Sequence, residues 1–329
     1  MKIAIIRLSA LGDIVHSLTV LPFIKKHLPS SHITWVTDSA FKELARHNPH
    51  IDQVLDIDLK SLKKDFSIKK LRAIKERLKK EYDVVFDMQG LIKSALIGTY
   101  LSKKRVGREI GCVKESLAAL FYTDRVVVPC EKNVVDRNMQ LISKYLGFDY
   151  SHTDILNKEP LLFFDKSKNY SHIDALLDRT NILYVPSSSV KNKNYPPKKY
   201  VEVIKSLPAN SLLLWGNEEE KRVAETIAKE CNAKILPKLS LNDLKYLISK
   251  TDLVIGGDTG PVHMAWGLNK KSVVLFGYTT PNLMFQTPKN RAISAKEVDL
   301  CNWDKKDGSI KEIEPGKIVE AAKKLLESE

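Results

Sequence analysis

The sequence predicts an α/β protein of two domains, each with a mostly parallel sheet. A chain of 329 residues is longer than one ordinary hydrophobic core accommodates. In both halves, short apolar runs alternate with segments of helical periodicity, as in parallel sheets covered by helices on both faces. A polar, weakly periodic stretch over 150–180 marks the linker. We assign 1–160 to one domain and 175–314 to a second, and we expect the two domains to face each other across a central cleft. Residues 315–329 are assigned to a C-terminal helix, for which packing back on the first domain stays open.

The first half carries five apolar runs that predict strands, at 2–8, 32–37, 53–59, 82–89 and 124–130. Segments with helical spacing predict helices near 14–28, 39–47, 67–80, 91–102 and 133–146.

The second half repeats this alternation. Strands are expected at 181–186, 211–216, 252–257 and 270–277, and helices at 198–207, 218–229, 240–250 and 315–327. Ser240 with Asp243 three residues later is a capping signature for the third of these helices. Ligands of open α/β sheets bind beyond the carboxyl ends of strands, so the loops after strands are the candidate sites.

The composition describes a folded protein, with 43% hydrophobic and 28% charged residues. Its four cysteines lie far apart without a CxxC pair, which argues against a disulfide framework or a structural zinc site and fits a reducing cytosol. We expect no signal peptide and no membrane span, because no apolar run approaches the roughly 20 residues needed to cross a bilayer.

The net charge of +13 is unevenly distributed, with ten Lys and Arg residues against two acids over 60–80. Such a stretch is either a solvated helix face or a surface for an anionic partner: nucleic acid, phospholipid, or a phosphorylated or carboxylated substrate. Aromatic residues are sparse within it, which weakens the single-stranded nucleic-acid alternative.

The richest loop reads DLVIGGDTGPVHMAWGL. Asp258, Thr259, Gly260 and Pro261 follow a strand and enter a helix, so helix amides, a hydroxyl and flexible glycine together suit a phosphate. His263 lies in the first helical turn. The alternative is a well-capped helix with a structural histidine.

Two further loops follow strands. In VPSSSVKNKNYPP, Ser188, Ser189 and Lys193 are candidates for binding a diphosphate, and a flexible polar loop is the alternative. In LLLWGNEEEKR, Glu218 is a candidate for binding ribose hydroxyls, although acids also favour helix N-termini in general.

The N-terminal SALGD places Asp13 directly after Gly12, at the first strand–helix junction. The carboxylate either caps the helix or serves as a base. The sequence lacks the motifs of several other enzyme classes: there is no G-x-G-x-x-G after Leu8, no P-loop and no G-x-S-x-G. The candidate loops also lack the paired acids of a metal site.

Six segments together resemble glycosyltransferase family 9, the lipopolysaccharide heptosyltransferases, over nearly the whole chain: SALGDIVHSL, FDMQGLIKSAL, KESLAALFY, KNYP, WGNEEE and GGDTGPVHMA. The first and last are quite specific, and the middle ones favour enzymes that add the first heptose to the Kdo of lipid A over those that add the second. The resemblance implies a GT-B fold of two Rossmann-like domains. It also implies an inverting transfer from ADP-L-glycero-β-D-manno-heptose without a metal or other cofactor.

The resemblance also implies residue roles. Asp13 becomes the catalytic base, held ionised by the helix N-terminus, and Gly12 supplies turn freedom. Lys193 assists catalysis at the diphosphate. The donor-binding set is Ser188, Ser189, Lys193, Glu218, Asp258, Thr259, Gly260, Pro261 and His263. The chain departs from the family in two places: serines stand where threonines are expected, and a shorter Glu218 region makes Glu219 the alternative acid.

We expect the first domain to bind the acceptor. The expected acceptor contacts are Ser9, Gly12, Lys63, Lys64, Gln89 and Lys114. The implied partners are ADP-heptose, Kdo-lipid A and the anionic surface of the inner membrane, on whose cytoplasmic face the protein is expected to act peripherally, without nucleic acid. Two alternatives stay open: an enzyme that adds the second heptose, and a basic nucleic-acid-binding protein.

Overall fold

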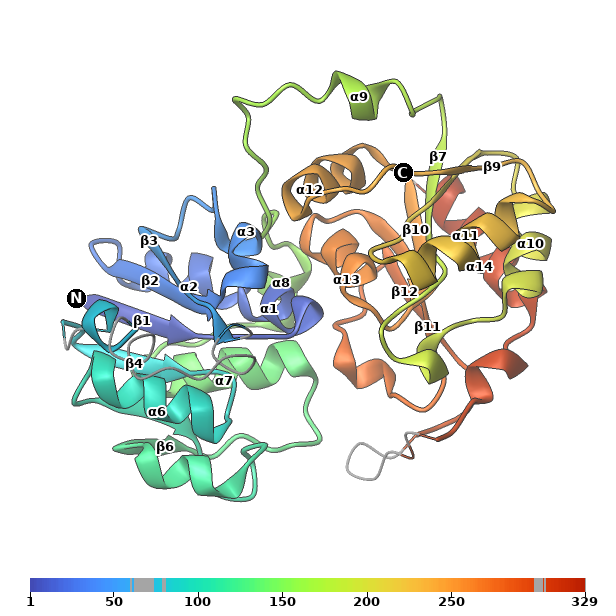
Figure 1. The fold of residues 1–329 in the computed structure, drawn as a ribbon. Helices are drawn as coiled ribbons and strands as arrows, with labels where there is room; N and C mark the ends of the chain where they lie inside the picture. The colour runs from blue at the N-terminus through green and yellow to red at the C-terminus, as the bar shows by residue number, and fades with distance from the viewer. Residues whose placement is uncertain (60, 62–73, 79–80, 299–303, 305, 329) are drawn as a thin grey trace. The chain divides into compact units, whose positions relative to one another are not determined.

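The computed structural model describes residues 1–328 except 60, 62–73, 79–80, 299–303 and 305. It divides into two compact units, Met1–Phe163 and Phe164–Glu329, which Figure 1 shows in blue to green and in green to red. The division falls within the predicted linker.

Unit 1 contains a six-stranded sheet in the order β3-β2-β1-β4-β5-β6, in which every neighbouring pair is parallel. Its strands are β1 (Lys2–Ile6), β2 (His32–Asp38), β3 (Gln53–Ile57), β4 (Val84–Asp87), β5 (Arg105–Arg108) and β6 (Asp124–Val126). The central strands β1 and β4 are buried almost throughout, which explains their continuous apolar runs.

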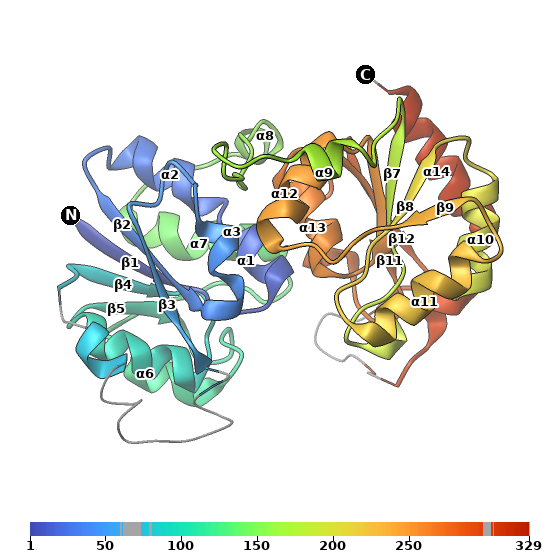
Figure 2. The same ribbon diagram turned by 45° about the horizontal axis from the view of Figure 1, so that its top comes forward.

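Helices cover both faces of this sheet, with α6 on one face and α2 and α7 on the other (Figure 2). The helices of unit 1 are α1 (Leu11–Ser17), α2 (Val20–His27), α3 (Lys42–Ala45), α6 (Ile92–Leu101), α7 (Val134–Leu146) and α8 (His152–Leu156), and the short 3₁₀ helices are η1 (Ser39–Phe41) and η2 (Ser116–Phe121).

The segment predicted as one helix at 14–28 forms two helices, α1 and α2, which are separated by Leu18 and Thr19. Pro22 explains the break, because it has no N–H to donate to the carbonyl of Leu18, four residues earlier. A proline is tolerated in the first turn of a new helix, and that is where Pro22 lies.

Unit 2 repeats the architecture with the order β12-β11-β10-β7-β8-β9, again with all neighbours parallel. Its strands are β7 (Asn181–Val185), β8 (Asn210–Leu213), β9 (Ala233–Ile235), β10 (Leu253–Gly257), β11 (Lys271–Phe276) and β12 (Asn290–Ser294). Its helices are α9 (Ser171–Asp174), α10 (Pro197–Lys205), α11 (Glu218–Ala228), α12 (Leu241–Lys250), α13 (Gly260–Gly267) and α14 (Pro315–Glu327), with η3 (Lys191–Lys193), η4 (Pro281–Leu283) and η5 (Ser309–Glu312).

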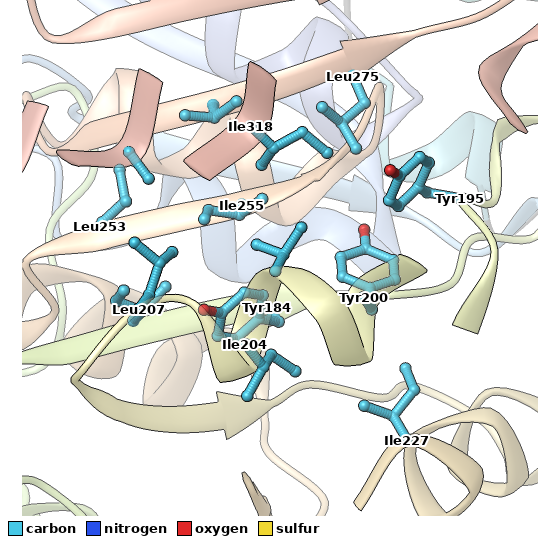
Figure 3. Packing of buried hydrophobic residues seen from close by; sticks show 14 of the residues in the cluster. Tyr184, Tyr195, Tyr200, Ile204, Leu207, Ile227, Leu253, Ile255, Leu275 and Ile318 are labelled. Carbon is cyan, nitrogen blue, oxygen red and sulfur yellow. The ribbon is translucent and has the colours of Figure 1, made fainter. Parts of the chain in front are cut away.

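The main core of unit 2 lies between the sheet and the layer of α10, α11 and α14, while α12 and α13 cover the opposite face (Figure 2). Figure 3 shows Tyr195 and Tyr200 packed among aliphatic side chains from the sheet and the helices of this layer. Ile318 of α14 is fully buried in this core. The apolar stripe of α14 is thus used within unit 2.

The prediction of two parallel α/β sheets is confirmed, with three strands missed. Of these, β9 and β12 are edge strands, β9 has only three residues, and β5 has the sequence RVGR. Their strand structure therefore depends on pairing with neighbours more than on intrinsic preference. Lys63, Lys64 and most of the helix predicted at 67–80 lie outside the described residues. Within the described part of the chain, no helix is both long and apolar enough to cross a membrane.

Candidate functional site

Each sheet has a switch point where the strand order reverses. In unit 2 the first strand, β7, lies between β8 and β10, and in unit 1 the first strand, β1, lies between β2 and β4. All strands of a parallel sheet end at the same edge, so the loops after β7 and β10 are neighbours, as are those after β1 and β4. Ligands of open α/β sheets bind at such points.

At the switch point of unit 2, Asp258 follows β10 and is almost fully buried. Its Oδ1 lies 2.8 Å from Nε2 of His263, in the first turns of α13. Its Oδ2 pairs with Nζ of Lys193, which ends η3 in the loop after β7. Nζ also donates to the Asp258 carbonyl at 3.2 Å. Two loops that are 65 residues apart in the chain are thus joined through one carboxylate.

The electrostatics of this cluster keep Asp258 ionised. Burial alone raises the pKa of Asp258, but the hydrogen bond from His263 and the charge of Lys193 outweigh it, and the pKa lies well below the ordinary value of 3.8. Because folding lowers the pKa of Asp258, its pairing with Lys193 and His263 stabilises the fold at any pH above the pKa that Asp258 has in the unfolded chain. This stabilisation is lost only as the pH falls through the lower pKa of the folded state. The pair is therefore intact at neutral pH.

Glycine at the end of β10 allows this pairing. A Cβ placed on Gly257 would collide with the backbone oxygen of Lys193, so any larger residue would push the loop after β7 away from the strand. The GG of the sequence motif is thus required by close backbone approach.

Three buried hydroxyls follow strands of unit 2 without a hydrogen-bond partner among the described residues: Oγ of Ser187 after β7, Oγ1 of Thr259 after β10 and Oγ1 of Thr279 after β11. Unpaired buried hydroxyls are costly, so they are candidate donors to a bound ligand. Thr259 was predicted, whereas Ser187 and Thr279 were missed. The rule that loops after strands carry sites would have pointed to Thr279 in GYTTP.

The predicted serines have different environments. Oγ of Ser188 donates to the Val190 carbonyl at 2.9 Å and lies 3.0 Å from Oδ1 of Asn194, so it holds the shape of its own loop. Ser189 is exposed. Gly260 and Pro261 begin α13 as predicted.

Glu218 and Glu219 both begin α11 and are exposed, next to the loop after β8. Nζ of Lys191 in η3 lies 3.3 Å from the carboxylate of Glu219. The start of α11 is therefore adjacent to the loop that carries Lys193, while Glu218 has no such pairing with that loop.

At the switch point of unit 1, Asp13 lies in the first turn of α1 with a side chain that is 42% exposed. Its Oδ2 accepts from the backbone N–H of Ala10 at 3.2 Å, and its Oδ1 pairs with Nη2 of the buried Arg7 at 3.0 Å. Arg7 also donates to the Met88 carbonyl after β4. The sequence did not single out Arg7, yet this residue fixes the carboxylate of Asp13.

Gln89 joins the same two loops. Its Oε1 accepts from the backbone N–H groups of Leu8 at 3.0 Å and Ser9 at 3.1 Å, so its amide oxygen has a structural role. Gly12 lies inside α1 and is not among the glycines with positive φ. The expected turn freedom at Gly12 is therefore wrong, and the position contributes only the absence of a side chain.

Lys114 is exposed and lies two residues before η2 begins. The neighbouring Glu115 N–H donates to the Gly90 carbonyl at 3.1 Å, so this segment lies beside the loop after β4. The structure thus brings Ser9, Asp13, Gln89 and Lys114 to one end of the sheet in unit 1.

We expect Asp258→Asn to lower the free energy of unfolding by about 3 kcal/mol, because it leaves Lys193 partly buried without its counter-charge. Urea unfolding followed by circular dichroism measures this loss. Glu320→Gln removes an exposed carboxylate from its pairing with Lys324 and is the matched control, with no measurable change expected. An unchanged midpoint for Asp258→Asn would show that the cluster does not stabilise the fold.

Comparisons with known proteins agree with this architecture. Residues 71–312 match the model of glycosyltransferase family 9 (heptosyltransferase). The chain is 35% identical over 346 residues to lipopolysaccharide heptosyltransferase 1 of Campylobacter coli, covering 100% of both chains. It is 25% identical over 317 residues to the protein of the same name from Salmonella typhimurium, covering 92% and 97%. The E. coli heptosyltransferase WaaC, solved with ADP-2-deoxy-2-fluoro heptose, superposes with a TM-score of 0.80 at 22% identity over 98% and 99% of the chains, which shows the shared fold.

Proposed function

The chain belongs to glycosyltransferase family 9, the heptosyltransferase family, and we propose that it transfers L-glycero-D-manno-heptose from ADP-heptose to the Kdo residue of Kdo-lipid A. It is a glycosyltransferase of the GT-B fold. The observation that carries the proposal is the identity along the whole chain to lipopolysaccharide heptosyltransferase 1. At the switch point of unit 2, the ammonium group of Lys193 and the unpaired hydroxyls support a nucleotide diphosphate as the donor.

The experiment is incubation of the purified chain with ADP-heptose and Kdo-lipid A, followed by mass analysis of the lipid and assay of released ADP. The expected product carries one added heptosyl residue. A second arm supplies an acceptor that already carries one heptose. Transfer to that acceptor alone would identify an enzyme that adds the second heptose, and no transfer to either would reject the function.

In the proposed reaction, Asp13 takes the proton from an acceptor hydroxyl while the hydroxyl oxygen attacks the anomeric carbon of the donor from the opposite face. The bond from that carbon to the diphosphate breaks, and its electron pair leaves with ADP. Lys193 and the amides at the start of α13 stabilise the charge that develops on the leaving group. Arg7 holds the carboxylate of Asp13 in place.

Lys193 retains donor capacity for this role. Its ammonium group has three N–H bonds, and the contacts with the Oδ2 and the carbonyl of Asp258 use two of them. The third is available to a phosphate oxygen. Ser187, Thr259 and Thr279 add unpaired hydroxyls from three neighbouring strand ends.

We expect transfer to proceed in excess EDTA, with at most a twofold stimulation by added Mg²⁺. Asp258 is the one acidic residue within the loops that follow β7 and β10, and its two oxygens are already engaged by Lys193 and His263. A single carboxylate so occupied is a poor Mg²⁺ ligand. Initial rates with and without EDTA test this, and complete loss of activity that Mg²⁺ restores would contradict it.

We also place the protein peripherally on the cytoplasmic face of the inner membrane, where its acceptor lies. In unit 1, Leu117 and Leu120 of η2 are 60% and 64% exposed, next to the exposed Lys114. Basic side chains near an anionic membrane contribute about 1 kcal/mol each, so a few support reversible docking beside apolar contacts.

A further inference from the structure

Three arginines gather at the carboxyl ends of the strands of unit 1. Arg7 follows β1, Arg108 ends β5 and Arg137 lies at the start of α7. Arg7 and Arg108 are only 7% and 5% exposed. Burial, followed by the charges of Arg137 and Arg7, lowers the pKa of Arg108 to about 9, and burial and Arg7 likewise lower the pKa of Arg137. Arg108 also donates to Asn138, the residue that follows Arg137 on α7, so β5 brings Arg108 to the start of that helix.

The two carboxylates near these arginines already have hydrogen-bond partners, and those of Asp87 lie outside the cluster. Asp13 pairs with Arg7 at 3.0 Å. Oδ1 of Asp87 accepts from the backbone N–H groups of Gln89 and Gly90, and Oδ2 accepts from the hydroxyls of Ser94 and Tyr122, each at 2.8 Å. The buried Asp87 thus serves its own loop and helix, and its pKa is raised by burial.

The arginines themselves retain unused donors. Nη2 of Arg108 donates to the neutral Oδ1 of Asn138 at 2.9 Å. In the described part of the chain, the buried Nε atoms of Arg7, Arg108 and Arg137 all lack a hydrogen-bond partner. The charges of Asp87 and Asp13 act on Arg108 and Arg137, and Asp13 pairs with Arg7. Even with both carboxylates ionised, three guanidinium groups face two anions. Buried excess charge is costly, and a bound oxyanion would relieve that cost.

We propose that Arg7, Arg108 and Arg137 form a binding site for the carboxylate of the acceptor sugar acid, beside Asp13. Planar guanidinium donors match a carboxylate in geometry as well as in charge. The inference rests on the proposed function, because a sugar acid carries its carboxylate on the same ring as the accepting hydroxyl. An anion beside the base is therefore this carboxylate, and the lipid phosphates belong to other sugars of the acceptor.

The test compares three acceptors: Kdo-lipid A, the same molecule with the sugar-acid carboxyl reduced to an alcohol, and Kdo-lipid A without the lipid phosphates. For the wild type, reducing the carboxyl should raise the acceptor KM roughly tenfold to hundredfold, as expected for a lost charge-assisted hydrogen bond. Arg137→Gln should raise the KM for Kdo-lipid A by a similar factor and leave the KM for the reduced acceptor unchanged. Its effect should persist with the dephosphorylated acceptor.

Arg108→Gln is the second variant and should show the same pattern. Lys144→Gln, an exposed cation on the same helix as Arg137, is the matched control and should leave every KM within twofold. The unfolding temperature of each variant is measured first. Because Arg108 is buried and Arg137 only half-buried, Arg137→Gln keeps the test available if Arg108→Gln does not fold.

Two kinetic outcomes would overturn the inference. If Arg137→Gln raises the KM equally for the native and the reduced acceptor, the arginine has a structural role. If its effect disappears with the dephosphorylated acceptor, the arginine binds a lipid phosphate and not the carboxylate. A binding arm does not depend on transfer. Free Kdo at millimolar concentration should raise the unfolding temperature of the wild type and not of Arg137→Gln. No shift in the wild type would reject the site, whereas absent heptose transfer with this shift intact would reject only the proposed function.

Discussion

Asp13→Asn should lower heptose transfer by about 1,000-fold and leave the affinity for ADP within a few-fold of the wild type. A positioned general base contributes roughly 10²- to 10⁴-fold, and an amide cannot take up the proton. Asparagine keeps an oxygen that can still accept from Arg7 or from the Ala10 N–H, so the loop geometry is preserved. Initial rates with Kdo-lipid A and calorimetric titration with ADP measure the two effects.

A carboxylate that only caps a helix predicts a different result. Asp13 does accept from the N–H of Ala10, as a cap would. The control is Asp38→Asn, because Asp38 is the last residue of β2 in unit 1 and caps η1 by accepting from the Ala40 N–H at 2.9 Å. We expect its turnover to stay within twofold. If a folded Asp13→Asn protein keeps the wild-type turnover, Asp13 is not the base and only caps its helix, as Asp38 does.

The strand–helix alternation was predictable because most strands of both sheets are buried on two faces and read as continuous apolar runs. β7 and β10, for instance, are buried at every position. The edge strand β9 has only three residues and one neighbour, so its own sequence carries little signal. The capping signature at Ser240 and Asp243 is confirmed, because such a signal is local: the Asp243 N–H donates to Oγ of Ser240 at 3.1 Å.

Pairing between candidate residues was not predictable in the same way. Lys193 and Asp258 were each expected to contact the donor, but their contact with one another follows from the adjacency of β7 and β10, which a single sequence does not specify. Likewise, three consecutive serines after β7 look alike in the sequence, and only the path of the loop decides that Ser187 is the buried one. Which side chain is buried depends on tertiary packing, and residue type alone does not determine it.

The second large effect is expected at Lys193. Lys193→Ala should lower kcat about 100-fold while changing the KM for ADP-heptose much less. Negative charge on the diphosphate increases as the bond to the anomeric carbon breaks, so a nearby cation stabilises the transition state more than the bound substrate. One such contact is typically worth about 3 kcal/mol. Single-turnover rates at saturating donor report the chemical step directly.

Lys191→Ala is the matched control, since Lys191 lies in the same 3₁₀ turn and pairs with Glu219 while both side chains stay largely exposed. We expect kcat within twofold for this variant. Lys193→Ala also leaves Asp258 with His263 as its remaining side-chain partner in this cluster, so both variants are compared at a temperature where urea unfolding shows them fully folded. If the KM for ADP-heptose rises while the single-turnover rate stays at the wild-type value, Lys193 binds the donor equally in the ground and transition states. The charge that develops on the leaving group must then be stabilised by the amides at the start of α13 and the unpaired hydroxyls of Ser187, Thr259 and Thr279.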